Sequence, residues 1–88
     1  MATIRFTSLF SERIGGVSSV DVAAATVESA LRALTGRHPE LEPLVWKGGG
    51  LNPVMVLFLN DQQLGPDDLG ARIQATDQID IVPAIEGG

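Results

Sequence analysis

Apolar and polar residues alternate in two short segments near the start of the chain. Residues 4–7 read Ile-Arg-Phe-Thr, and residues 20–22 read Val-Asp-Val. A period of two residues places alternate side chains on one face and is typical of a half-buried β-strand. Between the two segments, Gly15 and Gly16 can take positive φ at little cost, so the chain can reverse there. The pattern therefore predicts an opening β-hairpin.

A helical period follows from residue 27. Thr26 can cap the first turn, and Glu28 lies in that turn, where the helix dipole favours a negative charge. The apolar residues then fall at helical spacing: Val27, Ala30, Leu31 and Leu34. We expect Gly36 to end the helix, with Pro39 preventing its continuation. One apolar stripe of this helix should be buried.

The period is lost between residues 41 and 53, where prolines and the run Gly48-Gly49-Gly50 favour a surface loop that carries Trp46. Residues 54–59 (Val-Met-Val-Leu-Phe-Leu) are apolar at every position. Such a strand is either central and covered on both faces, or displays apolar side chains to a partner. A turn at Asn60-Asp61 should end it.

An irregular crossing leads on to a closing strand at residues 79–82. The crossing should bury two apolar residues, Leu69 and Ile73. In the closing strand Asp80 prefers water, so its neighbours Ile79 and Ile81 should point toward the helix. Val82 then shares the outer face with Asp80.

The elements follow one another in the order ββαββ. A mixed sheet of about four or five strands packed on one main helix is the ubiquitin-like β-grasp arrangement, an α+β fold. We expect the β-grasp domain to span residues 1–82. Residues 83–88 should form a flexible tail that ends in Gly87-Gly88.

Two segments of the C-terminal third carry a resemblance to a known family. They are residues 58–64 (FLNDQQL) and residues 76–88 (TDQIDIVPAIEGG). Together with the order of elements, they resemble the MoaD/ThiS family of ubiquitin-like sulfur carrier proteins. Members of that family have a related Asn-containing turn, an acidic turn before the last strand and a tail of the form Leu-Pro-Pro-x-x-Gly-Gly. Thr76, where many members have glycine, and Glu86, where small or neutral residues are more usual, depart from this pattern.

The resemblance implies that the protein is a cosubstrate and not an enzyme, although it would be a synthase subunit in a molybdopterin-type system. An ATP-using adenylyltransferase of the ubiquitin-activating type would join AMP to the carboxylate of Gly88. A sulfur donor or sulfurtransferase would then displace AMP, leaving a thiocarboxylate for an acceptor biosynthetic enzyme. The carrier would bind no cofactor, because ATP and Mg would be supplied at the activating enzyme. Five tail residues would enter the partner's channel: Pro83, Ala84, Ile85, Glu86 and Gly87.

The segment from Trp46 to Pro53 makes the chain longer than the thiamine-pathway carriers. It is nearer in layout to the molybdopterin-synthase small subunit or to the cysteine-biosynthesis carriers. Two other functions stay open at this point. The protein could be a ubiquitin-like modifier whose tail becomes an amide on a target lysine, or a non-covalent β-grasp interaction module whose terminal glycines are incidental.

Strand parity predicts where a partner would dock. If the odd-numbered residues of the strand at 54–59 face the helix, the even-numbered ones lie on the open face beside Asp80 and Val82. An exposed aromatic in such a patch favours docking, and by resemblance ubiquitin-like proteins use this face. The docking patch consists of four residues: Val56, Phe58, Asp80 and Val82. In the alternative interpretation, the loop carrying Trp46 folds over the patch and makes Phe58 a core residue.

The composition limits the kinds of functional site that we expect in this chain. The 88 residues are 44% hydrophobic, enough for one domain, and include one histidine and no cysteine. We expect no metal site. Gly48-Gly49-Gly50 lacks the Gly-Lys-Ser/Thr signature of a phosphate-binding loop, and His38 is expected to interact with the helix C-terminus. The acidic residues Asp61, Asp67 and Asp68 lack the spacing of a calcium loop.

The net charge is -5, and the basic residues are scattered. Because such a surface repels phosphate backbones, nucleic acid is not an expected partner. No segment approaches the roughly 20 apolar residues that span a bilayer, so no membrane partner is expected either. The start of the chain does not resemble a signal peptide, and we expect a cytoplasmic protein.

Overall fold

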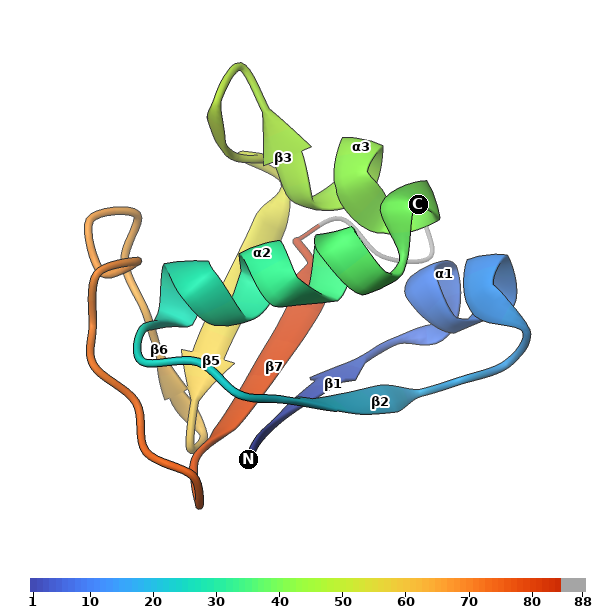
Figure 1. Ribbon diagram of the computed structural model, residues 1–88. Helices are drawn as coiled ribbons and strands as arrows, with labels where there is room; N and C mark the ends of the chain where they lie inside the picture. Colours follow the sequence, from blue (N-terminus) through green and yellow to red (C-terminus); the bar gives the residue numbers. More distant parts are fainter. Residues whose placement is uncertain (85–88) are drawn as a thin grey trace.

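The computed structural model describes residues 1–84, and residues 85–88 lie outside the described part. One long helix, α2 (Val27–Arg37), lies across one face of a five-stranded mixed sheet (Figure 1). The strands are β1 (Ala2–Phe6), β2 (Ser19–Val22), β5 (Met55–Leu59), β6 (Gln62–Gln63) and β7 (Gln78–Pro83). Their order in the sheet is β2-β1-β7-β5-β6, with β7 parallel to β1 and antiparallel to β5. The predicted α+β class is confirmed.

The opening hairpin forms as predicted, with β1 and β2 antiparallel, but its connection is not a simple turn. A short helix α1 (Ser8–Ser11) and a 3-10 turn η1 (Glu12–Ile14) precede the two glycines. This insertion buries Phe10, whose ring stacks on Phe6 with centroids 5.7 Å apart. Gly15 and Gly16 then take φ values of 76° and 89°, the conformation for which glycine was expected.

Helix α2 begins as predicted. The hydroxyl of Thr26 accepts a hydrogen bond from the Ser29 N–H at 3.1 Å, and the Ser29 hydroxyl accepts one from the Thr26 N–H at 3.0 Å. This reciprocal capping pairs N–H groups that a helix start leaves free. The crossing segment pairs two more: the N–H groups of Val27 and Glu28 donate to the carbonyl groups of Ala71 and Leu69, at 3.0 and 2.8 Å.

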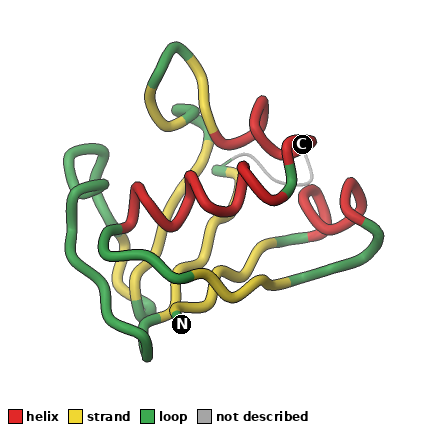
Figure 2. The backbone as a smooth tube through the Cα atoms, in the orientation of Figure 1, coloured by secondary structure: helices red, strands yellow, loops and turns green. Residues whose placement is uncertain are grey.

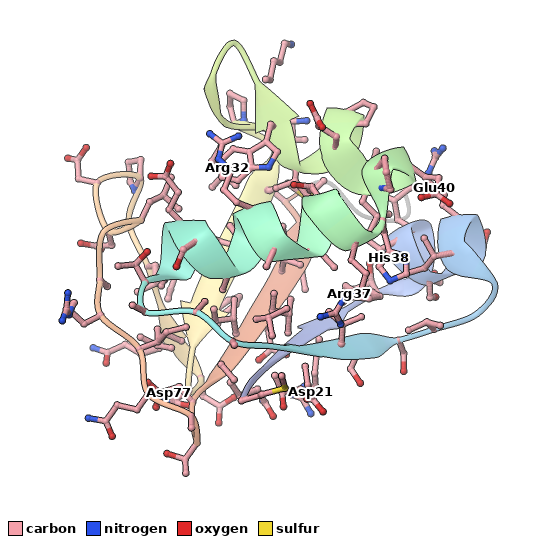
Figure 3. All side chains as sticks on the ribbon, viewed as in Figure 1. Asp21, Arg32, Arg37, His38, Glu40 and Asp77 are labelled. Carbon is pink, nitrogen blue, oxygen red and sulfur yellow. The ribbon has the colours of Figure 1, made fainter. Side chains whose placement is uncertain are left out.

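The predicted end of this helix at Gly36 is wrong. The helix runs through Gly36 to Arg37, and the chain leaves it at His38, with φ −127° and ψ 80°. A residue that precedes proline is driven out of the helical region, so Pro39 sets the boundary and glycine is not needed. Arg37 of the last turn donates to the Asp21 carbonyl at 3.0 Å and so ties the helix to β2 (Figure 3).

The prediction of a surface loop at residues 41–53 is also wrong, because this segment contains short regular elements (Figure 2). They are η2 (Pro39–Leu41), α3 (Glu42–Val45), β3 (Trp46–Lys47) and β4 (Gly50–Leu51). Leu41, Val45 and Trp46 are buried in the core. Gly48 and Gly49 take positive φ, 63° and 85°, and close the tight β3–β4 hairpin.

The core lies between α2 and the sheet, and strand parity confirms the faces predicted for β7. Ile79 and Ile81 are fully buried against the helix layer, whereas Asp80 and Val82 are half-buried on the opposite, open face of the sheet. In the crossing, Ile73 is buried as predicted, but Leu69 is only partly buried. The central strand is β7 and not β5, which lies next to the edge strand β6.

Candidate functional site

The root of the C-terminal tail is anchored in the middle of the sheet. β7 pairs with β1 on one side and β5 on the other, and its last residue, Pro83, lies opposite Met55. The sheet contacts extend one residue further, because the Ala84 N–H donates to the Val54 carbonyl at 2.6 Å. The sheet thus reaches beyond residue 82, where we expected the domain to end.

Proline is tolerated in this central strand for a local reason. The Thr3 N–H donates to the Asp77 carbonyl at 3.1 Å, which shows that the odd-numbered residues of β7 form their hydrogen bonds toward β1. The pairing with β1 ends at Phe6 and Ile81, and Thr7 begins the turn into α1. The N–H that Pro83 lacks would therefore have no partner at this position.

The four residues of the predicted docking patch come together on the open face. Val56 lies directly opposite Val82, and Phe58 lies directly opposite Asp80. All four are half-buried, and they form two successive cross-strand pairs. The apolar pair Val56–Val82 is the one nearer to the tail root. Their adjacency is established, and their use by a partner stays a prediction.

Asp80 has a charged neighbour that the sequence interpretation missed. Arg5 lies beside Asp80 in the β1–β7 register, and its Nε is 2.9 Å from Asp80 Oδ1. The hydrogen bond and the negative charge of Asp80 raise the pKa of the Arg5 guanidinium. The Arg5 side chain is 54% exposed, so this cation is available at the border of the docking patch.

A hollow of about 360 Å³ adjoins the docking patch on the side of β1 and β2. Its lining includes Arg5, Thr7, Asp80 and Val82. The Thr7 hydroxyl oxygen is buried and has no hydrogen-bond partner within residues 1–84. The hollow therefore presents the Arg5–Asp80 ion pair beside the docking patch.

The two turns that carried the family resemblance contact each other at the far end of β7. The Asn60 side chain donates to Asp77 Oδ1 at 3.0 Å and accepts from the Gln78 N–H at 2.9 Å. Asp77 Oδ2 also accepts from the Gln74 N–H at 2.7 Å. The bond from Asn60 and then that from Gln74 hold the pKa of Asp77 below its ordinary value. We call this contact the Asn60–Asp77 clamp; it fixes the start of β7, at the opposite end of the strand from Pro83 (Asp77 is labelled in Figure 3).

The two turns that meet in the clamp differ in backbone conformation. Asn60 and Asp61 take positive φ, 50° and 70°, as a two-residue hairpin turn requires. Thr76 does not take positive φ, and the turn before β7 is closed by hydrogen bonds between Gln74 and Asp77. The turn therefore takes a form that does not need the glycine found in many family members.

Trp46 does not cover the docking patch, so the alternative interpretation of this residue is wrong. Its indole N–H donates to the Thr35 hydroxyl of α2 at 3.2 Å, and the Arg32 guanidinium carbon lies 3.7 Å from the ring centroid (Figure 3). Both partners belong to α2, which packs on the other face of the sheet. Phe58 therefore stays at the open face.

The tail residues Ile85, Glu86, Gly87 and Gly88 lie outside the described residues, and their roles stay predictions. Between residues 1 and 84 no three metal-ligating side chains gather into a group that could hold an ion. Over the same range, no helix has the length and apolar character needed to cross a membrane.

Comparisons with known proteins agree with this geometry. A chain of the BexX/CysO complex from Amycolatopsis orientalis is 25% identical, with a TM-score of 0.88 and 100% of each chain covered. SAMP1 from Haloferax volcanii is 30% identical, with a TM-score of 0.84 over 99% of this chain and 98% of that one. A comparison with curated protein sequences gives no significant match.

A chain of the complex between subunits 1 and 2 of molybdopterin-converting factor from Helicobacter pylori shares the fold. It is 23% identical, with a TM-score of 0.61 over 99% of this chain and 97% of that one. These similarities confirm the ubiquitin-like β-grasp fold. The model of the ThiS family matches residues 4–88, which include the docking patch, both turns of the clamp and the terminal diglycine. The chain therefore belongs to the ThiS family.

Proposed function

We propose that this protein is a sulfur carrier whose terminal carboxyl group, on Gly88, is adenylated and then converted to a thiocarboxylate. Membership in the ThiS family over residues 4–88 supports a sulfur carrier role, in which the protein is a cosubstrate of other enzymes. The observation that carries the proposal is the position of β7. This central strand leads to the terminal diglycine and leaves the sheet beside the docking patch.

The chemistry requires activation because a free carboxylate is a poor electrophile. Its charge repels nucleophiles, and oxide is a poor leaving group. In the proposed first step, a carboxylate oxygen of Gly88 attacks the α-phosphorus of ATP, and pyrophosphate leaves. In the second, a hydrosulfide equivalent attacks the acyl carbon, the bond to AMP breaks, and a proton is released as the thiocarboxylate forms. ATP and Mg would be held by the activating enzyme.

The folded body would position the tail. A partner that binds the docking patch contacts Val82, which lies one residue before the end of β7 at Pro83. Because β7 is hydrogen-bonded on both sides, docking would fix the point from which the tail enters the partner. The last two residues lack side chains and would pass through a narrow channel, where the reacting carboxyl must reach near-attack geometry.

A second function has a specific observation in its favour. The chain is 30% identical to SAMP1, and a further Haloferax volcanii structure that is 28% identical is named small archaeal modifier protein 1. A modifier would use the same activated acyl group, but a lysine amine of a target protein would displace AMP and form an amide. A non-covalent interaction module would use the docking patch alone.

Intact-mass spectrometry separates the three functions. The full chain is incubated with an adenylyltransferase of the ubiquitin-activating type, ATP, Mg and a sulfur donor. Replacement of one oxygen by sulfur supports the carrier, and ligation to a larger protein supports the modifier. Binding without any change of mass would leave only the interaction module. A chain truncated after Glu86 serves as control, because it should form neither product.

A further inference from the structure

We propose that Lys47 is an acyl acceptor, whose amine takes the activated carboxyl group of Gly88 from a second copy of this chain and forms an isopeptide bond. Lys47 is the only lysine in the sequence, so a link to a side-chain amine of another copy can form at this position alone. The inference rests on the proposed activation of Gly88, but its product differs from the thiocarboxylate and it assigns a separate site.

The fold holds Lys47 at the tip of a short hairpin. Lys47 is the last residue of β3, and it pairs with Gly50 across the turn formed by Gly48 and Gly49. The residue before it, Trp46, is buried and hydrogen-bonded to α2. The exposed lysine therefore stands on a base that core packing holds in place.

The Lys47 amine is accessible on the side of the molecule away from the docking patch. It forms no ion pair with any residue between 1 and 84. The docking patch lies on the open face of the sheet, whereas the hairpin contacts α2, which packs on the other face (Figure 1). A partner that binds the docking patch of one copy therefore leaves the lysine of that copy uncovered.

A hollow of about 510 Å³ beside the lysine offers a seat for the incoming tail. Its lining includes Arg32, Glu42, Trp46 and Lys47, and none of the docking-patch residues. Two of the six basic residues of the chain thus meet here with one carboxylate, whereas the whole chain carries a net charge of -5. The hollow is more basic than the rest of the chain and favours an acidic segment.

The tail supplies such a segment, because Glu86 stands two residues before Gly88. The Arg32 side chain rises from α2 toward β3, and its guanidinium carbon lies 3.7 Å from the Trp46 ring centroid (Figure 3). Its ion pair with Glu28 is long, at 3.7 Å between Nη2 and Oε2, and both side chains are about half-exposed, so this pair is weak. We expect Arg32 to bind Glu86 of the second copy, which brings Gly88 beside the lysine.

The reaction needs no reagent beyond the activated chain. In that chain AMP is bonded to the acyl carbon of Gly88. The neutral amine of Lys47 attacks this carbon, the bond to AMP breaks, and AMP leaves as its dianion. The two protons lost by the original ammonium group pass to water. The linked product has the mass of two chains less one water.

The test uses a chemically activated chain, so that it does not depend on an activating enzyme. A full chain carrying a thioester at Gly88 is mixed with the full 15N-labelled chain, and the thiolate takes the place of AMP as leaving group. We expect an amide-linked dimer. After digestion with trypsin, tandem mass spectrometry should find residues 73–88 of the unlabelled chain attached to Lys47 of the labelled one.

Matched variants of the labelled chain test the site. Lys47→Arg should abolish the link. Lys47→Arg combined with Arg13→Lys moves the lysine to another exposed position outside the hollow, and the link should form about 10-fold more slowly than in the parent chain. Arg32→Gln should slow the reaction about 10-fold, but should have no effect when the thioester chain carries Glu86→Gln.

Four results would overturn the proposal. They are the absence of a dimer, a link to the α-amine of Met1 in place of Lys47, an equal rate for the relocated lysine, and an effect of Arg32→Gln that is the same with and without Glu86→Gln. The thioester replaces adenylation, and no sulfur is transferred in this experiment. Each of these results therefore leaves the proposed sulfur carrier function to its own test.

Discussion

Substitutions at two adjacent residues of β7 should affect different properties, one the stability of the fold and the other the binding of a partner. Ile81 is fully buried between the sheet and α2, whereas Val82 is half-buried on the open face. Truncating a buried isoleucine to alanine removes about 2–5 kcal/mol of unfolding free energy, through lost transfer energy and the cavity left behind. Truncating a half-exposed valine should remove less than about 1 kcal/mol.

For Ile81→Ala we expect the free energy of unfolding to fall by about 3 kcal/mol, since the side chain is fully buried. At about 4–8 °C per kcal/mol for a domain of this size, Tm should fall by roughly 12–24 °C. Val82→Ala should lower Tm by no more than about 8 °C. It should instead weaken binding to the activating enzyme, because the docking patch loses a contact at the tail root.

The assay is thermal and urea unfolding followed by circular dichroism and by the fluorescence of Trp46, the single tryptophan. Binding to the activating enzyme is measured on the same two variants. The reasoning is refuted if the two substitutions destabilise the protein equally, or if Val82→Ala destabilises it more. Either result would mean that the faces of β7 are assigned incorrectly.

Three further predictions concern stability alone. The pKa of Asp77 is held below its ordinary value, so its carboxylate stabilises the fold above about pH 4 and loses that effect as pH falls through the folded pKa. The loss of Tm caused by Asp77→Asn should therefore be largest at pH 7 and should shrink as pH falls below about 4. Gly36→Ala should stabilise the protein by about 0.5–1 kcal/mol, because Gly36 is helical and an added Cβ would meet no other atom. Gly16→Ala should destabilise it by about 1 kcal/mol, because Gly16 has a φ of 89°. Urea unfolding measures both changes. Thr35→Val should lower the unfolding free energy by about 1–3 kcal/mol, because the buried indole N–H of Trp46 loses its acceptor. A double-mutant cycle with Trp46→Phe should show coupling between the two sites.

Features that depend on neighbours in sequence could be predicted. The cap at Thr26, the positive φ of Gly15 and Gly16, and the faces of residues 79–82 all follow from local backbone preferences or from the period of the strand. The docking patch follows from the same parity together with the pairing of β5 and β7, which the β-grasp arrangement implies and the period alone does not.

Elements that span only about one period could not be predicted. α3, β3 and β4 span two to four residues each, so the buried Val45 and Trp46 form no repeat in the sequence. The end of α2 differs from the predicted Gly36 because Pro39 drives His38 out of the helical region, so the helix can continue through the glycine to Arg37.

Contacts between distant segments were missed for a different reason. Arg5 and Asp80 are 75 positions apart, and alternation puts both on the open face without saying that β1 and β7 are neighbours. The Asn60–Asp77 clamp likewise depends on how two turns meet at one end of the sheet. Such pairs require the order of the strands, which the hydrophobic pattern does not specify.

The central claim is that the folded body presents a terminal carboxyl group for activation. It is tested most directly by locating the modification with tandem mass spectrometry after incubation with the activating enzyme, ATP, Mg and a sulfur donor. We predict that sulfur replaces one carboxyl oxygen of Gly88, and that Gly88→Ala slows this reaction about 100-fold without changing Tm. Sulfur found on any other residue, or full activity of a chain truncated after Glu86, would contradict the account.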